Sequence, residues 1–226
     1  MTHAVHIPDD VLQRVRLRRG RLTLFDTLDA RSTALLVIDM QDAFLLPGAA
    51  GEVAAARGIV PAISRLAQGL RDKGGLVAWV KMTVRDDTSY WSVWFEHFMS
   101  ATPRGRGLTA DLVSGGPGHG LYGDLDVRDG DLVVEKTRYS AFIQGSSDLD
   151  GLLRARGIDT VVVVGTLTNV CSESTARDAM MLNYKTVLVS DANATLSDAD
   201  HNASLAAVIQ TFGEVITTDE VLAKLA

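Results

Sequence analysis

Three side chains of complementary chemistry stand at or near the ends of apolar segments: a carboxylate, an ammonium and a thiol. Asp39 follows the run Leu-Leu-Val-Ile, Lys136 follows Leu-Val-Val-Glu, and Cys171 comes shortly after the valines 161–164. A thiol beside a proton acceptor and a cation can perform nucleophilic catalysis. A charged residue that ends an apolar strand also loses hydration unless it is paired or functional. These positions therefore predict a site for nucleophilic chemistry.

Each residue taken alone also has a purely structural interpretation. Asp39 is suited to capping a turn, Lys136 to pairing with it, and Cys171 to filling the core as a small hydrophobe. Two apolar strands each end in a charged residue, and burying a charge is costly. A purely structural interpretation is therefore less satisfactory for the three residues together than for any one of them.

The surroundings of Cys171 favour the functional interpretation. Residues 165–171 lead from an apolar segment into the amphipathic helical pattern of residues 172–180. We therefore expect the sulfur at a helix N-terminus, where the macrodipole and free N–H groups favour a thiolate over a thiol of ordinary pKa about 8.5. The same N–H groups are placed to hold an oxyanion, and each such donor contributes about 3 kcal/mol to transition-state stabilisation.

The elements that position these residues alternate between strands and helices. Short β-branched segments at 34–38, 76–80, 132–134, 160–164 and 186–189, with a weaker one at 214–217, are typical of buried parallel strands. Apolar residues at helical spacing occur around 59–70, 149–153 and 205–209. This alternation predicts an α/β fold with an open, mostly parallel sheet covered on both faces, in which ligands bind beyond the carboxyl ends of the strands.

The length of 226 residues, 46% of them hydrophobic, suits one domain. We assign residues 1–30 to an N-terminal arm with a basic helix at 9–19, and residues 31–226 to the main domain. Residues 83–122 fit the alternation poorly and form an insertion. Its aromatic residues at helical spacing indicate a core or subunit-interface stripe, or alternatively a lid over a pocket: Tyr90, Trp91, Trp94, Phe95 and Phe98.

Composition excludes several classes of function. The net charge of -6 provides no positive field for nucleic acid or an anionic membrane. The apolar runs are far shorter than the roughly 20 residues of a membrane-spanning helix, and residues 1–30 lack the apolar stretch of a secretory signal. A single cysteine excludes an intramolecular disulfide and a multi-cysteine metal site. We expect a cytoplasmic protein.

Three motifs in this order resemble the isochorismatase-like cysteine hydrolases. They are LLVIDMQDAF at 35–44, VEKTRYSAF at 134–142 and VGTLTNVCSESTARDA at 164–179, and the resemblance extends from about residue 33 to the C-terminus. It implies a Rossmann-like three-layer fold with a six-stranded sheet, a catalytic triad of Asp39, Lys136 and Cys171, and no cofactor. It also implies a cis peptide between Thr166 and Leu167, which turns the Leu167 N–H toward the site beside that of Cys171.

Differences within the family narrow the activity. Nicotinamidases carry an Asp-x-His-x-x-His metal site after the second strand, whereas residues 82–88 read MTVRDDT, so we expect no metal. His97, His119 and His201 are scattered and are expected at surface or capping positions. The second and third motifs most resemble the ureidoacrylate and carbamoyl-amide branch. The resemblance implies substrate contacts from Gln41, Phe44, Tyr139, Phe142 and Thr168, and a substrate carboxylate is a candidate partner for Arg138, Arg85 or Lys81.

Three functional hypotheses follow. The first is a metal-free hydrolase that cleaves the C–N bond of a small amide or ureido compound through a Cys171 thioester. The second is an isochorismatase-type vinyl-ether hydrolase with Asp39 as general acid, in which Cys171 has no role. The third is a non-catalytic binding protein that uses the region of Trp91 and Trp94. Resemblance also implies a homo-oligomer, a dimer or tetramer, with a small-molecule substrate as its other partner.

Overall fold

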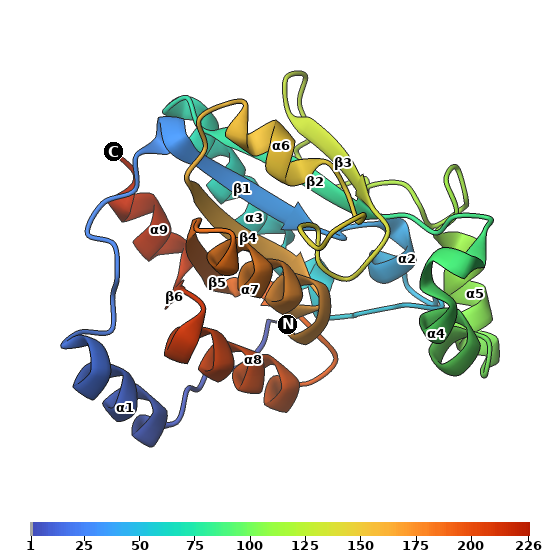
Figure 1. Ribbon diagram of the computed structural model, residues 1–226, viewed down its shortest axis with the longest axis horizontal. Helices are drawn as coiled ribbons and strands as arrows, with labels where there is room; N and C mark the ends of the chain where they lie inside the picture. The colour runs from blue at the N-terminus through green and yellow to red at the C-terminus, as the bar shows by residue number, and fades with distance from the viewer. Residues whose placement is uncertain (1) are drawn as a thin grey trace.

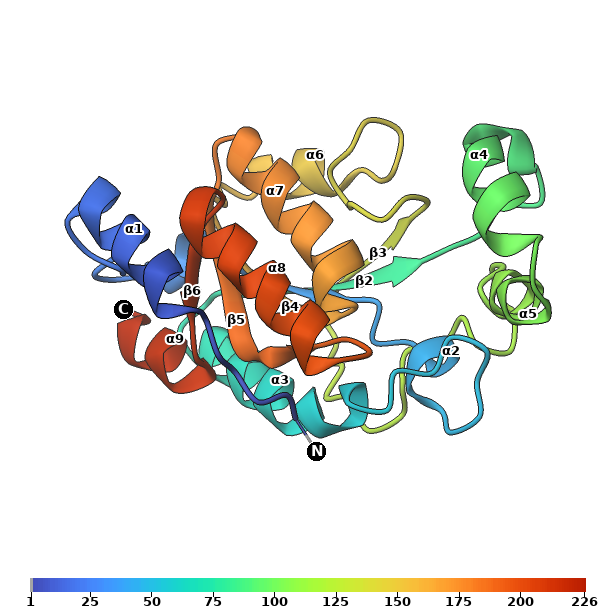
Figure 2. The same cartoon turned by 90° about the horizontal axis from the view of Figure 1, so that it is seen from below.

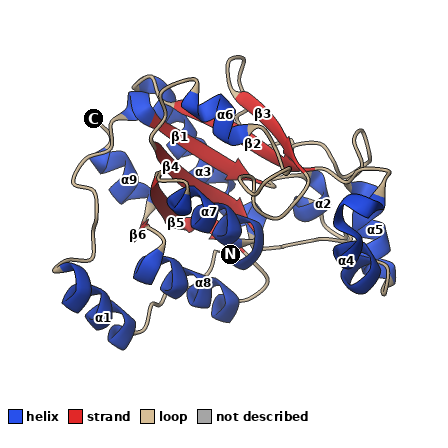
Figure 3. Ribbon diagram, in the orientation of Figure 1, coloured by secondary structure: helices blue, strands red, loops and turns tan. Residues whose placement is uncertain are grey.

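The computed structural model describes residues 2–226 and contains one six-stranded sheet in the order β3-β2-β1-β4-β5-β6, with every neighbouring pair parallel (Figure 3). The strands are β1 (Thr33–Ile38), β2 (Leu76–Met82), β3 (Leu132–Lys136), β4 (Thr160–Thr166), β5 (Lys185–Ala194) and β6 (Glu214–Ile216). Each overlaps a predicted segment, although β5 continues five residues beyond its predicted end at residue 189. The α/β fold class is confirmed.

Helices connect the strands. The α-helices are α1 (Asp9–Arg19), α2 (Asp42–Leu45), α3 (Ala56–Asp72), α4 (Ser92–Trp94), α5 (Pro103–Asp111), α6 (Leu149–Arg154), α7 (Glu173–Met181), α8 (Asp198–Thr211) and α9 (Thr218–Lys224). Two short 3₁₀ turns, η1 (Ala30–Ser32) and η2 (Thr88–Trp91), and two π-helical turns, η3 (Phe95–Met99) and η4 (Thr168–Ser172), complete them.

The molecule has three layers, seen edge-on in Figure 2, with α3 and α9 on one side of the sheet and α6, α7 and α8 on the other. Side chains alternate across each strand, so Leu35 and Val37 pack toward α3, whereas Leu36 and Ile38 pack toward α7 and α8. All residues of the central strands β1 and β4 are buried. Their near-continuous apolar runs follow from burial on both faces.

The end of β4 passes very close to the end of β1. Gly165 has φ +116°, and a Cβ atom there would lie 2.1 Å from the carbonyl oxygen of Ile38. Only glycine can adopt this conformation at this distance. The pairing with β5 also shifts register between Val163 and Gly165, and the buried side chain of Asn193 donates to the carbonyl oxygens of Val163 and Val189 across that irregularity.

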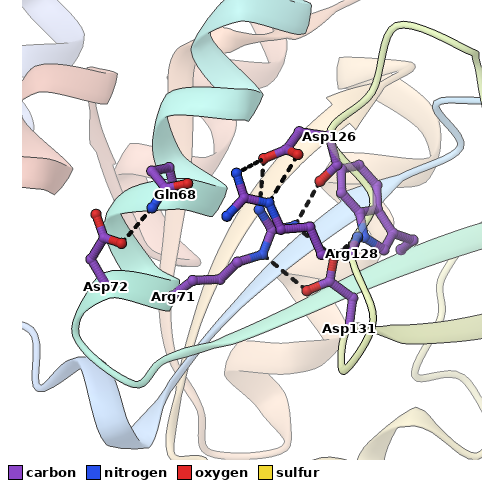
Figure 4. Close-up of polar contacts among 7 residues, drawn as sticks. Gln68, Arg71, Asp72, Asp126, Arg128 and Asp131 are labelled. Carbon is purple, nitrogen blue, oxygen red and sulfur yellow. Dashed lines mark hydrogen bonds and ion pairs between the residues drawn. The ribbon is translucent and has the colours of Figure 1, made fainter.

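An arginine network ties the long connection before β3 to α3 (Figure 4). Arg71 donates to both carboxylate oxygens of Asp131, at 3.0 and 2.6 Å, and to Asp126 at 2.9 Å. The indole N–H of Trp79, on β2, donates to Asp131 at 2.8 Å. Burial tends to raise the pKa of Asp131, but these donors outweigh it and hold the pKa below its usual value. The network fixes the approach to β3 and thereby to Lys136.

The predicted aromatic stripe adopts mixed helical geometry rather than one regular helix. Residues 88–99 run through η2, α4 and η3, and Figure 1 shows α4 and α5 projecting beyond the sheet layers. Trp91 stacks on Trp94 with ring centroids 4.7 Å apart, while Val93 and Phe98 are exposed. Whether this insertion serves as lid or interface remains a prediction, as does the division into residues 1–30 and 31–226.

The predicted basic helix is α1, and it packs through Val11 and Val15 against Ile209 of α8. Within residues 2–226, no helix combines the length and apolar character needed to cross a membrane.

Candidate active site

Asp39 follows β1 directly and is fully buried. Its φ of +49° lies in the left-handed region, which costs a non-glycine residue about 1–3 kcal/mol and which the surrounding structure must hold. Its Oδ2 accepts from Lys136, whereas its Oδ1 is buried with no hydrogen-bond partner within residues 2–226. Burial raises the pKa of Asp39, and Lys136 only partly offsets the effect. One carboxylate oxygen is thus open to accept a proton.

Lys136 reaches Asp39 from two strands away. It ends β3, and its fully buried side chain crosses the end of β2 to place Nζ 2.8 Å from Asp39 Oδ2. The same ammonium donates to the carbonyl oxygen of Arg138 at 3.1 Å and lies 3.6 Å from the sulfur of Met82. Burial opposes the charge, but attraction to Asp39 and Cys171 outweighs it and raises the pKa of Lys136. Lys136 is therefore a permanent cation in the site.

Cys171 lies in the turn η4 between β4 and α7, where it is 4% exposed. The thiol is close enough to Asp39 and Lys136 for its protonation to depend on theirs. The expectation of a resting thiolate is wrong: burial, followed by the charge of Asp39, raises the pKa of the thiol well above its ordinary value, and Lys136 only partly compensates. Desolvation and a neighbouring negative charge both favour the neutral thiol. These effects favour a protonated sulfur at rest.

The backbone before Cys171 provides hydrogen-bond donors. The peptide bond between Thr166 and Leu167 is cis, at the position that the family resemblance implies. Outside the helices and strand ladders of residues 2–226, the N–H of Leu167 makes no backbone hydrogen bond. The Thr166 hydroxyl donates to the carbonyl oxygen of Ala194 at 3.2 Å, which ties this segment to β5.

Three residues expected to contact substrate are instead occupied by the protein itself. Gln41 is fully buried, and its amide donates to the carbonyl oxygens of Met82 and His119 and accepts from the Met82 N–H. Phe44 belongs to the apolar core against α3, and the Thr168 hydroxyl bonds to His201. The sequence places these residues beside the strand ends. That position is the same for a residue that contacts substrate and for one that only supports the site, so the sequence does not distinguish the two roles.

Tyr139 and Phe142 are more peripheral. The Tyr139 hydroxyl accepts from the indole of Trp94 at 2.7 Å, and burial raises the pKa of Tyr139. Phe142 packs on Tyr184 with centroids 5.4 Å apart. Tyr139 borders a cavity of about 380 Å³ with Trp91, Arg138 and residues of α7 that include Ser174 and Arg177.

A larger cavity of about 760 Å³ lies on the other face of the β2 and β3 ends, lined by Thr83, Glu135 and Thr137 among others. Glu135 and Thr137 flank Lys136 in sequence, and side chains alternate along a strand, so they point away from the face that Lys136 occupies. We therefore associate the site of Asp39, Lys136 and Cys171 with the smaller cavity. Tyr139, which borders the smaller cavity, is close enough to Cys171 for its pKa to depend on the protonation of the thiol.

Several residues around the site carried no interpretable sequence signal. His119 and His201 were expected at surface or capping positions, but both are buried, at 5% and 0% exposure. Met82, which ends β2 and pairs in register with Lys136, lies two residues beyond the predicted strand 76–80.

Comparison with known proteins places this geometry in context. Residues 33–220 match the isochorismatase domain family. The chain is 32% identical over 201 residues to an uncharacterized isochorismatase family protein of Bacillus subtilis, covering 86% of this chain and 95% of that protein. It is 36% identical to the ureidoacrylate amidohydrolase RutB of Variovorax paradoxus, covering 85% and 81%. A solved cysteine hydrolase from Pseudomonas syringae superimposes with a TM-score of 0.75 at 35% identity, covering 88% and 94%.

Proposed function

The chain belongs to the isochorismatase family of hydrolases, and on that premise we propose that it cleaves the C–N bond of a small amide or ureido compound through a thioester on Cys171. The similarity to a ureidoacrylate amidohydrolase supports the substrate class. The segment 82–88 lacks the paired histidines of the metal-containing branch, which supports a metal-independent reaction.

One observation carries the proposal: a fully buried ion pair close to the thiol, with one carboxylate oxygen that has no hydrogen-bond partner within the described residues. Lys136 and Asp39 are both inaccessible to solvent and 2.8 Å apart, and Asp39 Oδ1 is unpaired within the described chain. A buried carboxylate with an unsatisfied oxygen costs stability, so its retention is best explained by a reaction that uses that oxygen.

In the first half-reaction, Asp39 takes the thiol proton on Oδ1 as the sulfur forms a bond to the substrate carbonyl carbon. The N–H groups of Leu167 and Cys171 donate to the oxyanion. Lys136 keeps the negative charge of the site tolerable while the proton moves. Protonated Asp39 then gives its proton to the leaving nitrogen, the C–N bond breaks, and ammonia or an amine departs from the thioester.

In the second half-reaction, Asp39 is again a carboxylate and removes a proton from water, which attacks the thioester carbonyl. The C–S bond breaks and the proton returns to sulfur, so the resting thiol is regenerated. A ureido substrate releases carbamate by these steps, and a simple amide releases a carboxylate. We place the rest of the substrate in the cavity bordered by Tyr139, Trp91 and Ser174, which lies one helical turn beyond Cys171.

The test is turnover of a panel of primary amides and N-carbamoyl amino acids by the wild-type protein and Cys171→Ala, with ammonia release as the readout. We expect Cys171→Ala to lose at least about 10³-fold in kcat, as nucleophile removal does in hydrolases of this mechanism. Intact-mass spectrometry of the wild-type protein should show an acyl adduct on Cys171. Circular dichroism controls for folding.

Undiminished turnover by Cys171→Ala would overturn the covalent mechanism. If that variant also hydrolysed a vinyl ether at the wild-type rate while Asp39→Asn did not, the isochorismatase-type reaction with Asp39 as general acid would replace it.

A further inference from the structure

A buried histidine, His201, forms a hydrogen bond with the turn that contains Cys171. Thr168 opens this turn, and its hydroxyl lies 2.9 Å from Nδ1 of His201 on α8. The other ring nitrogen, Nε2, lies 3.0 Å from the carbonyl oxygen of Ser190. A carbonyl oxygen only accepts, so Nε2 carries the proton, Nδ1 is the acceptor, and the Thr168 hydroxyl donates.

That tautomer requires a neutral ring. Burial lowers the pKa of His201 to about 4, so Nδ1 keeps its lone pair at neutral pH. His201 is fully buried and its two nitrogens are both engaged. A buried imidazole with both partners satisfied orients those partners strictly, because any rotation leaves a polar group unpaired.

Further contacts reach the same turn from the segment after β5. The Ser204 hydroxyl donates to the carbonyl oxygen of Thr168 at 3.2 Å, and the Thr195 hydroxyl donates to Asn169 at 2.6 Å. Thr168 lies between Leu167 and Cys171, whose N–H groups we assign to the oxyanion. Fixing Thr168 at its hydroxyl and carbonyl therefore fixes the direction of both donors.

The N-terminal arm braces His201 from its other side. The ring of His3 stacks on the ring of His201 with centroids 4.6 Å apart and planes at 19°. His3 Nε2 accepts from the Thr195 N–H at 2.9 Å, so Nδ1 carries the proton and donates to Asp198 at 2.7 Å. Asn202 binds the arm backbone at Ala4 and His6. All these arm residues precede the family match at residues 33–220.

We infer that His201 is a positioning residue for the catalytic turn, and that the N-terminal arm, through His3, is an added part that holds His201 in place. This inference rests on the proposed function, because a positioning role has meaning only if the turn is catalytic. It assigns the arm, which lies outside the matched domain, to the active site of this chain.

The experiment compares His201→Phe with His201→Asn. Phenylalanine keeps ring volume and stacking but has no acceptor, whereas the Oδ1 of asparagine can take the place of Nδ1 and accept from Thr168. We expect His201→Phe to lower kcat about tenfold with KM changed less than twofold, since misdirected donors weaken the transition state more than the ground state. His201→Asn should recover at least half of the wild-type kcat.

A second readout needs no substrate. Hydrogen exchange of the amides of residues 167–172 should quicken in His201→Phe and return toward the wild-type rate in His201→Asn. His3→Ala should reproduce the quickening in weaker form and lower kcat about threefold. His6→Ala is the matched control, because only its backbone N–H binds Asn202, and it should behave as wild type.

Unchanged kcat in His201→Phe, or an equal loss in the phenylalanine and asparagine variants, overturns the inference, because either result removes the acceptor at Nδ1 from the explanation. Failure of the proposed function is recognised separately, by turnover that survives Cys171→Ala. In that case the exchange measurement still shows whether His201 and His3 order the turn.

Discussion

At the level of single residues, each ionisable group of the site affects the protonation of the others. Lys136 compensates the buried charge of Asp39, while Asp39 and burial keep the proton on Cys171. In the proposed mechanism the thiol attacks only when its proton has an acceptor, and Asp39, whose Oδ1 is unpaired within the described residues, is the neighbouring carboxylate that can take it. The site therefore differs from one that stores a reactive thiolate.

This arrangement predicts slow alkylation. At pH 7 iodoacetamide should modify Cys171 more slowly than it modifies a free thiol of pKa about 8.5, because the raised pKa leaves a smaller thiolate fraction. The group with the raised pKa gains its negative charge only at higher pH. The rate should therefore keep rising with pH beyond 9, where the free thiol has already levelled off. The measurement is a pH series of alkylation rates by mass spectrometry.

Asp39→Asn is the control for that prediction. It keeps the burial of Cys171 and the Lys136 cation but removes the charge that raises the pKa of the thiol. Alkylation at pH 7 should accelerate in this variant. A rate equal to or below that of the wild type would show that access, rather than the charge of Asp39, controls the thiol.

At the level of elements, the positions of Asp39 and Cys171 depend on how closely β1 and β4 approach at their ends. Gly165 makes that approach possible, with its positive φ and the Ile38 carbonyl where a side chain would begin. Asn193 then fills the irregular pairing with β5 by two hydrogen bonds. The strand ends and the turn after β4 form one unit.

Gly165→Ala should lower the free energy of unfolding by about 3 kcal/mol or more, since the new methyl group meets backbone and the φ value is unfavourable for alanine. Chemical denaturation measures the change. Gly151→Ala is the matched control, because Gly151 lies inside α6, has an ordinary φ and has open space around its Cβ position. That substitution should be neutral or stabilise by up to about 1 kcal/mol through helix propensity. Comparable losses in both variants would contradict the close-approach argument.

At the level of the whole molecule, the insertion at residues 83–122 leaves apolar surface uncovered. Val93 and Phe98 are 60% and 62% exposed on adjoining turns of the same segment, while Trp91 and Trp94 pack inward on Tyr139. Neighbouring exposed apolar residues are typical of interaction surfaces. We propose that this segment contributes to a homo-oligomer, a dimer or tetramer.

Phe98→Glu should therefore shift the protein toward a smaller species in sedimentation velocity, because a carboxylate in an apolar interface loses hydration without gaining a partner. Leu17→Glu is the control, since Leu17 is 81% exposed on α1, away from this segment. An unchanged sedimentation coefficient for Phe98→Glu, or an equal shift in both variants, would remove the insertion from the interface.

Much of the fold, and part of the candidate site, could be predicted from the sequence alone. The segments that became β1 and β4 are so uniformly apolar that burial on both faces is the natural outcome, and Asp39 and Lys136 end strands whose carboxyl ends share one edge. Gln41 and Thr168 show what the sequence could not predict. Their position beside those ends was foreseeable, but whether the amide and hydroxyl face a cavity or bind the protein depends on residues 82, 119 and 201, which are distant in sequence.

Local pattern by itself determined the order of strands and helices, the parallel sheet and the three residues that meet at its edge, because periodicity and strand polarity are properties of the chain itself. Tertiary structure alone decided that the pKa of the Cys171 thiol is raised, that one oxygen of Asp39 is unpaired within the described residues, and that His3 lies on His201. The burial of a group and its distance to other charges depend on residues from all parts of the fold. No local segment of the sequence contains that information.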